Sequence, residues 1–442
     1  MRPKASRMTD VTDNAGTAMH ALMTELFPIC RSLTGPGLRQ TLSRFADFVP
    51  FTLHEVPSGT KCFDWTVPPE WIVRDAWVEN SAGERVIDFQ VNNLHLVGYS
   101  EPVDVTLSLT ELKEHLHALP DLPDAIPYVT SYYRRYWGFC LTQKQLDQMP
   151  EDTYRAVVDT TLDDAGSLTY ADLLIPGDSD EEILLSSYSC HPSMANNELS
   201  GPVLTTWLAR YLMDLPQRRY SYRIVIVPET IGSIAYISRH LETLRRNVRA
   251  GYVVNCVGGP DQATFLESRT GDTLADRAAL HVLNSREEPF KHWTYARRAS
   301  DERQYCSPGV ELPVASVLRS KYHDYPEYHT SLDDLDFVRP EHMQASYDLY
   351  VEIITTLEAN RTYRATVPCE PQLGPRGLYP NLGDRTHQET ALYDRMALLA
   401  YADGNTDLIE IAERNDSTVA RLAEHIPALA ENGLLLETGE GR

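Results

Sequence analysis

The stretch 182-EILLSSYSCHPSMANNELSGPVLTTWLARYL-212 contains the pattern that decides the fold. It opens with EILLSSYS (182–189), an apolar run of strand length. A polar loop, CHPSMANNELSG (190–201), follows, and then apolar residues recur at helical spacing until Pro216 stops them. The stripe consists of Val203, Leu204, Trp207, Leu208, Tyr211, Leu212 and Leu215. Strand, loop and helix in this order predict one unit of an α/β domain.

The same alternation continues along the chain. Strands are predicted at YRIVIV (222–227), GYVVNCV (251–257) and PVASVL (313–318), and helices at 237–248, 274–283 and 341–360. Strands that alternate with helices predict a mostly parallel sheet with helices on both faces. Ligands of such sheets bind beyond the carboxyl ends of the strands.

Two further modules flank or interrupt this domain. Helical spacing between residues 18 and 50 gives way to short alternating runs rich in Trp and Tyr, which predict strands. After about residue 370, a segment rich in Pro and Gly leads to three amphipathic helices and the strand-like LLLE. We predict an α/β domain from 18–55 and 156–365, an inserted mainly-β domain at 56–155, and a winged-helix-like domain at 370–442.

Charge and composition limit the classes of partner. The 442 residues carry a net charge of −23, which disfavours nucleic acids and anionic membranes. From Glu370 to Arg442 there are 6 basic and 13 acidic residues, so the last module favours an intramolecular or homo-oligomeric contact over DNA. No apolar run approaches a transmembrane length, and MRPKASRMTDVTDNAG lacks a secretory apolar segment. Seven scattered cysteines without a CxxC pair indicate reduced thiols, so we expect a cytoplasmic protein.

Imidazoles and carboxylates gather where the predicted strands end. His191 follows the strand at 182–189, and Glu229 follows the strand at 222–227. Asp301, Glu327 and His329 come later in the chain. Zinc binds His nitrogen and carboxylate oxygen, and a catalytic site leaves one position for water. Singly, each of these residues is more typical of a helix cap, a turn or a structural histidine; together they favour a metal site. Cys190 is predicted to point away from His191, because neighbours on a strand face opposite ways.

Four collinear motifs resemble a known family. CHPSMANNELSG, VPETIGS, SDERQYCSPGVELPV and YPEYHTSLDDLDF are similar to segments of bacterial aminopeptidase-like proteins related to zinc aminopeptidases and glutaminyl cyclases. The resemblance spans residues 20 to 436. It implies a phosphorylase/hydrolase-like α/β core with a mixed central sheet, an inserted β module, a C-terminal winged-helix-like module and zinc.

The resemblance also implies roles for single residues. His191, Asp301 and His329 match metal ligands of the family. Glu229 stands where the wider aminopeptidases carry two adjacent glutamates, one a base and one a ligand; the second place here holds Thr230. Glu229 is therefore either the base or a ligand.

The largest departure from the family lies in the loop CHPSMANNELSG (190–201). Asn197 falls where relatives carry an aspartate that bridges two metals, and a neutral amide is a poor bridge between two dications. Glu198, one position along, could contact a second metal or simply begin the next helix. One zinc is expected at the site, two are in question, and a site without metal is an alternative.

Three functions remain open at this stage. The first is a zinc-dependent aminopeptidase-like amide hydrolase, acting on a small peptide or peptide-like metabolite. In this hypothesis Glu198 or Glu327 binds the substrate ammonium. The second is a metal-dependent cyclase or deacylase in a biosynthetic pathway. The third is a binding or scaffold descendant that lost catalysis, motivated by Asn197 and Thr230.

Overall fold

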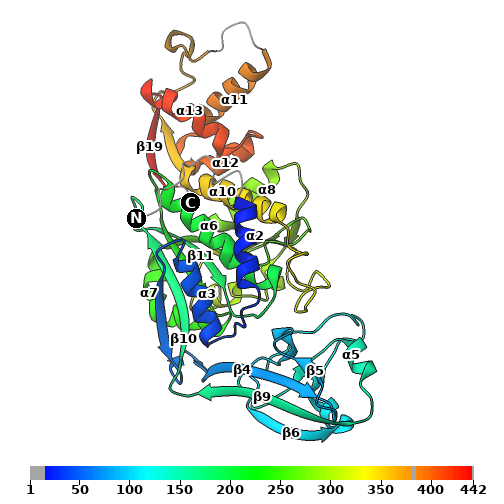
Figure 1. Cartoon of the computed structure of the whole chain (residues 1–442). Coiled ribbons are helices and arrows are strands. Elements are labelled where there is room, and N and C mark those ends of the chain that lie inside the picture. The colour runs from blue at the N-terminus through cyan, green and yellow to red at the C-terminus, as the bar shows by residue number, and fades with distance from the viewer. Residues whose placement is uncertain (1–14, 380–384, 441–442) are drawn as a thin grey trace, which may run out of the picture. The chain divides into compact units, whose positions relative to one another are not determined.

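A computed structural model describes residues 15–379 and 385–440 of the chain (Figure 1). The chain forms two compact units. The N-terminal unit comprises the residues up to Thr270 together with Lys291–Tyr347, and the C-terminal unit comprises Gly271–Phe290 and the residues from Asp348 onward. The candidate site lies entirely within the N-terminal unit.

An eight-stranded mixed sheet is the centre of the N-terminal unit. In spatial order its strands are β1 (Thr52–Pro57), β10 (Ser167–Ile175), β12 (Ser221–Val227), β11 (Glu182–Tyr188), β13 (Val248–Val253), β16 (Val314–Arg319), β14 (Ala263–Leu266) and β15 (Lys291–Trp293). The inner strands β12, β11, β13 and β16 run parallel. Antiparallel pairs appear between β1 and β10, β10 and β12, and β14 and β16. The predicted mixed α/β core is confirmed.

The inner strands are covered on both faces. All seven residues of β11 and of β12 are buried, and successive residues of a strand point to opposite faces. Outside the inserted module, the helices of this unit are α2 (Ala15–Leu26), α3 (Pro36–Ala46), α6 (Ser200–Asp214), α7 (Ile231–Asn247), the one-turn α9 (Glu302–Tyr305) and the first part of α10 (Pro340–Ala359). The apolar stripe that begins at Val203 is the buried side of α6, as predicted.

The inserted module has its own four-stranded sheet, in the order β5-β4-β9-β6. Its strands are β4 (Glu70–Glu79), β5 (Arg85–Asp88), β6 (Val103–Ser108) and β9 (Thr153–Asp163). The short strands β2 (Lys61–Cys62), β3 (Trp65–Thr66), β7 (Leu116–His117) and β8 (Phe139–Cys140) and the helices α4 (Leu109–Leu112) and α5 (Gln143–Gln148) complete it. Because β9 pairs with β4 from Arg155 to Asp163, this sheet extends past the predicted boundary at residue 155.

The C-terminal unit combines a three-stranded sheet, in the order β18-β17-β19, with short helices. Its elements are α8 (Leu274–Ser285), the remainder of α10, β17 (Arg361–Ala365), α11 (Arg385–Tyr401), β18 (Asp403–Asp407), α12 (Leu408–Arg414), α13 (Val419–Glu431) and β19 (Leu435–Glu440). The sheet begins with β17, ahead of the predicted boundary at residue 370, because β17 is its central strand. The predicted strand LLLE lies at the start of β19.

Two properties expected from composition can be compared with the structure. All seven cysteines are free thiols. Within the described ranges, no helix has the length and apolarity needed to cross a membrane.

Candidate functional site

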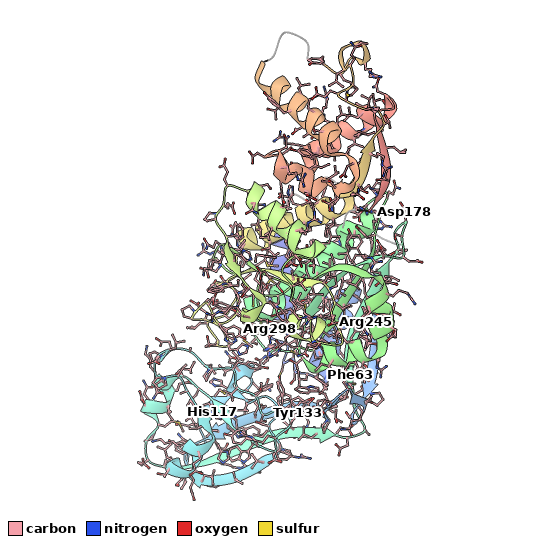
Figure 2. All side chains as sticks on the ribbon, turned by 180° about the vertical axis from the view of Figure 1, so that it is seen from behind. Phe63, His117, Tyr133, Asp178, Arg245 and Arg298 are labelled. Atoms are coloured by element: carbon pink, nitrogen blue, oxygen red, sulfur yellow. The ribbon has the colours of Figure 1, made fainter. Side chains whose placement is uncertain are left out.

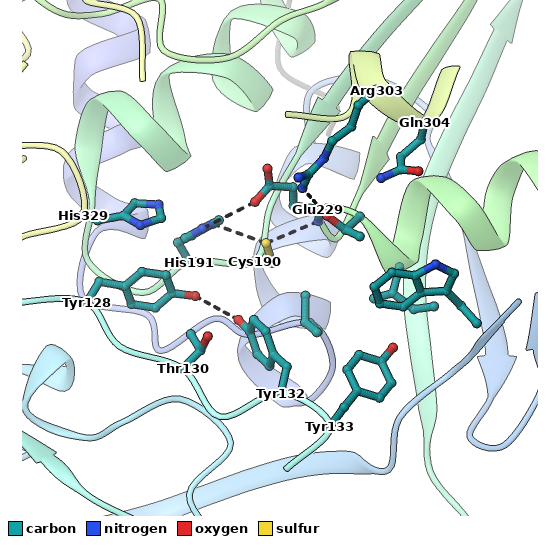
Figure 3. A pocket seen from close by; sticks show the side chains of 14 residues that line it. Tyr128, Thr130, Tyr132, Tyr133, Cys190, His191, Glu229, Arg303, Gln304 and His329 are labelled. Atoms are coloured by element: carbon teal, nitrogen blue, oxygen red, sulfur yellow. Dashed lines mark hydrogen bonds and ion pairs between the residues drawn. The ribbon is translucent and has the colours of Figure 1, made fainter. Parts of the chain in front are cut away.

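A pocket of about 410 Å³ lies beyond the carboxyl ends of β11 and β12 (Figure 3). This is the edge at which ligands were expected. Its lining comes from the segment between α2 and α3, from the inserted module, from the ends of both strands, from the short helix α9 and from the loop that carries His329. The lining residues are Leu33, Trp65, Tyr128, Thr130, Tyr132, Tyr133, Cys190, His191, Glu229, Thr230, Ile231, Arg303, Gln304 and His329.

His191 stands in the loop after β11 with both ring nitrogens directed at carboxylates. Nδ1 lies 2.9 Å from Oε2 of Glu198, and Nε2 lies 3.7 Å from Oε2 of Glu229. Burial by itself lowers the pKa of His191, but the hydrogen bond and charge of Glu198 outweigh it, so the net shift is upward. The Nδ1–H donates to Glu198, which leaves Nε2 facing the pocket.

Glu198 is held by a buried arginine. Nε of Arg31 lies 3.4 Å from Oε1 of Glu198, and neither side chain has exposed surface. The same Nε donates to the carbonyl of His191 at 3.0 Å, and Nη1 donates to the carbonyl of Leu26 at 2.7 Å. Glu198 therefore orients His191 from behind and offers no surface to a substrate.

Asn197 lies in a π-helical turn, Ala195–Leu199, at the start of α6. The carboxylate of Asp333 accepts the backbone N–H groups of Asn196 at 2.5 Å and of Asn197 at 2.9 Å. The Asn197 side chain donates to the Tyr188 hydroxyl at 3.0 Å, and its Oδ1 is buried without a partner. Asp333 thus fixes the loop that carries the departure from the family pattern.

Glu229 and Thr230 follow β12 at the pocket wall. The side chain of Glu229 is 22% exposed, and burial raises its pKa, while His191 and Arg303 oppose that rise. Thr230 has a φ of 65°, which is a strained conformation for a β-branched residue. Such strain is typical of functional sites, where the surrounding structure holds it in place.

Asp301 lies just behind Glu229 and is fully buried. Its Oδ1 accepts hydrogen bonds from the Thr230 backbone N–H at 2.8 Å and from the Ser233 hydroxyl at 2.9 Å. Its Oδ2 is buried without a partner. Burial, and next the charge of Glu229, raise the pKa of Asp301 to about 7. One oxygen is thus fixed by the protein and the other is free for a ligand.

His329 approaches the pocket from the loop that precedes α10. Its φ is 57°, and its carbonyl accepts the backbone N–H of Tyr128 at 2.8 Å. Its ring stacks on Tyr328 at 3.9 Å and lies 5.3 Å from the ring of His191. Nε2 is buried without a partner, and burial followed by the charge of His191 lowers the pKa of His329 to about 2. A neutral imidazole with an unused nitrogen is the form that binds a metal.

Nε2 of His329 and Oδ2 of Asp301 are donor atoms of the kind that a divalent cation binds. Both are buried, and a buried polar atom without a partner is costly unless a ligand satisfies it. Among the described residues, however, the group compact enough to hold a metal consists of Cys190, His191 and Glu198. Their donor atoms all lie within 4.8 Å of one another. In that group Glu198 is already engaged by Arg31 and by Nδ1 of His191. Nε2 of His329 and Oδ2 of Asp301, which have no hydrogen-bond partner, belong to residues outside this group.

The expectation that Cys190 points away from His191 is wrong. Sγ of Cys190 lies 3.3 Å from Nδ1 of His191, and both residues line the pocket. The alternation fails because β11 ends at Tyr188, so these two residues no longer follow strand geometry. Burial and the neighbouring acids Glu198 and Glu229 raise the pKa of Cys190 well above its usual value, which keeps the thiol protonated.

The remaining site candidate, Glu327, does not line the pocket. Its carbonyl accepts the backbone N–H of Thr330 at 3.1 Å and so shapes the His329 loop. Arg31 and Arg303 were not among the site residues predicted from the sequence. A lone arginine in a chain with 40 basic residues carries no signal for burial or for a pocket position.

Comparison with known proteins places the chain in a family. A family model described as a domain of unknown function, DUF4910, matches residues 20–360. The chain belongs to this family. A second model, a winged helix-turn-helix, matches residues 361–437 of this DUF4910 protein and confirms the predicted C-terminal module.

Three similar proteins show which known fold the chain has. A Clostridium acetobutylicum protein named "Putative polysaccharide biosynthesis protein with aminopeptidase-like domain" is 44% identical, over 96% of this chain and 97% of the relative. A solved structure titled "putative peptidase" from Clostridium acetobutylicum superposes with a TM-score of 0.91 at 42% identity, covering 97% and 98% of the two chains. BSAP, a zinc aminopeptidase from Bacillus subtilis, superposes with a TM-score of 0.57 at 11% identity, covering 78% and 94%. The DUF4910 core therefore has the zinc aminopeptidase fold.

Proposed function

We propose that the protein hydrolyses amide bonds of small peptides or peptide-like metabolites, with one divalent cation, zinc foremost, and Glu229 as general base. One observation carries the proposal: Nε2 of His329 and Oδ2 of Asp301 are buried without partners beside a pocket that contains His191 and Glu229. The fold shared with zinc aminopeptidases supports the choice of metal.

Two of the three proposed ligand atoms have no hydrogen-bond partner, and the third, Nε2 of His191, lies 3.7 Å from Oε2 of Glu229. Nε2 of His191, Nε2 of His329 and Oδ2 of Asp301 would hold the cation, since two imidazoles and one carboxylate are an established zinc ligand set. When bound, the cation supplies a Lewis acid that polarises the scissile carbonyl. The hydrogen bonds from Thr230 and Ser233 to Asp301, and from His191 to Glu198, orient these ligands from outside.

Glu229 is better placed to move protons than Asp301. Glu229 lines the pocket, whereas Asp301 lies behind it. The Glu229 carboxylate takes a proton from the attacking water and passes it to the leaving amine, and its raised pKa brings it closer to the working pH for this step. The charges of His191 and Arg303 oppose this rise and favour the ionised carboxylate.

Neutral or positive groups occupy the places that a second cation would need. Asn197 and Thr230 are uncharged, and the guanidinium of Arg31 lies beside Glu198. A second dication close to that guanidinium would be repelled, which supports a site with a single metal.

We expect one equivalent of zinc per chain in protein purified without chelator. His329→Ala should remove most of it, because the buried imidazole is lost and the remaining donors do not close a site. Zinc is measured by inductively coupled plasma mass spectrometry, and circular dichroism checks the fold. His292→Ala, which removes an exposed imidazole paired with Glu267, should keep its zinc. Full zinc content in His329→Ala, or none in the wild-type protein after loading, contradicts the proposal.

The double variant Asn197→Asp/Thr230→Glu should bind two equivalents, since it supplies both carboxylates that the two-metal pattern requires. Either single variant should stay at one equivalent. Zinc titration with a chromophoric competitor distinguishes these cases. A second equivalent in the wild-type protein would show that neutrality at these two positions does not limit the metal number.

A second candidate is deacylation in a biosynthetic pathway; the biosynthetic setting, though not the reaction, is the one in the name of the Clostridium acetobutylicum relative. It uses the same bond cleavage and the same residues. Screening N-acyl amino sugars and N-acyl amino acids beside aminoacyl amides distinguishes it from peptide hydrolysis.

A further inference from the structure

The charge at the pocket mouth is opposite to what an aminopeptidase substrate requires. Arg303, on the one-turn helix α9, is exposed, and it donates from Nη2 to the Thr230 hydroxyl at 2.9 Å. It forms no ion pair with any described residue. In Figure 3 its side chain extends toward Glu229 at the upper side of the pocket. A guanidinium that forms no ion pair is suited to bind a substrate anion, although its charge also lowers the pKa of Glu229.

Acidic groups that could bind a substrate ammonium are already engaged or lie elsewhere. Glu229 is the one acid among the described residues that line the pocket, and the proposed chemistry uses it. Glu198 is paired with Arg31 and fully buried. Glu302 accepts hydrogen bonds at Oε1 from the Tyr322 hydroxyl and from the backbone. Its Oε2 has no hydrogen-bond partner, but the side chain is fully buried and does not line the pocket. A free amino terminus therefore finds no spare carboxylate in the pocket.

Aromatic side chains form the opposite wall. The hydroxyls of Tyr128 and Tyr132 are hydrogen-bonded at 2.8 Å, and Trp65 meets Tyr133 edge to face at 5.6 Å. Trp65 is 40% exposed and Tyr133 52% exposed, and Phe63, labelled with Tyr133 in Figure 2, is 58% exposed. Exposed aromatic rings at the mouth of a pocket are typical of a surface on which a substrate ring stacks.

We propose that the substrate is an N-acylated, ring-bearing carboxylate, bound with its anion on Arg303 and its ring against Trp65 and Tyr133. This inference rests on the proposed amide hydrolysis and specifies its substrate class. Recognition through a carboxylate replaces recognition through an α-ammonium group.

Calorimetric titration of zinc-loaded, full-length protein tests the proposal with three probes that share the phenylalanine side chain. The probes are N-acetyl-L-phenylalanine, its neutral carboxamide, and L-phenylalaninamide, which carries the ammonium. The acid should bind roughly 10- to 100-fold more tightly than the neutral amide, as expected for a charge-assisted hydrogen bond. Arg303→Met should remove that difference, and Arg303→Lys should keep part of it.

The matched control is Arg298→Met. Arg298 is exposed, lies over the ring of Tyr295 and does not line the pocket, so its removal should leave the preference for the acid intact. Trp65→Ala should weaken the acid and the neutral amide alike, because stacking does not depend on the carboxylate.

The outcomes separate the two proposals. Equal binding of acid and amide, a preference for the ammonium probe, no binding of any probe, or a preference that persists in Arg303→Met overturns the substrate class and leaves amide hydrolysis standing. Arg303-dependent binding of the acid without any cleavage supports the anion site and contradicts the hydrolase.

Discussion

Replacing Glu229 with glutamine should lower kcat by about 10²- to 10⁴-fold and leave the zinc content unchanged. The carboxamide has nearly the same shape as the carboxylate but cannot accept the proton of the attacking water. Glu229 lines the pocket with its carboxylate 3.7 Å from Nε2 of His191. Steady-state kinetics with the best amide substrate from the screen, together with metal analysis of the same sample, measures both effects.

This pair of measurements separates the two roles that the sequence left open. A ligand role for Glu229 would lower zinc affinity along with kcat, whereas a base role lowers kcat alone. Glu327→Gln is the matched control, because Glu327 lies in the His329 loop outside the pocket lining and its variant should behave like the wild-type protein. Full activity in Glu229→Gln would remove the base from the proposed mechanism.

Arg31→Met should lower the free energy of unfolding by about 3–5 kcal/mol, because it leaves the buried carboxylate of Glu198 without its cation. Both side chains lack exposed surface, so water cannot compensate for the loss. The variant should also weaken zinc binding, because Glu198 would no longer hold Nδ1 of His191 in place. Urea-induced unfolding followed by tryptophan fluorescence measures the first effect.

The double variant Arg31→Met/Glu198→Gln tests the cause. It removes both charges, so it should be less destabilised than Arg31→Met alone. Arg44→Met breaks the exposed pair with Glu25 and should cost no more than about 1 kcal/mol. Additive losses for Arg31 and Glu198 would show that the two side chains are not coupled.

The core of the fold was predictable because its signals are local. EILLSSYS (182–189) predicts a strand, and the apolar stripe that begins at Val203 predicts a helix. The structure has β11 and α6 at these places. Boundaries were harder to place. β9 continues its pairing to Asp163, and the turn that ends this strand, at 164–165, lies beyond the predicted boundary at residue 155.

The candidate site was only partly predictable, for a physical reason. His191, Glu229, Asp301 and His329 stand in motifs with ligand chemistry, so their residue types drew attention. The partners that position them depend on tertiary packing between distant segments. Arg31 reaches Glu198, and Asp333 reaches the backbone of Asn197, across sequence separations that carry no pattern. The same holds for Tyr128, whose backbone N–H holds the His329 loop.

The hydrogen bond from the Tyr128 backbone N–H to the His329 carbonyl has a consequence for folding during synthesis. A chain emerges from the ribosome amino end first, and its domains fold as their residues become available. The inserted module and His191 are synthesised well before His329, whose loop docks on that module at 2.8 Å. The nascent chain therefore carries an incomplete set of donors until nearly all of the α/β domain has been translated. A product truncated before this loop would contain the pocket tyrosines and His191 but would lack His329, so the site could not be assembled.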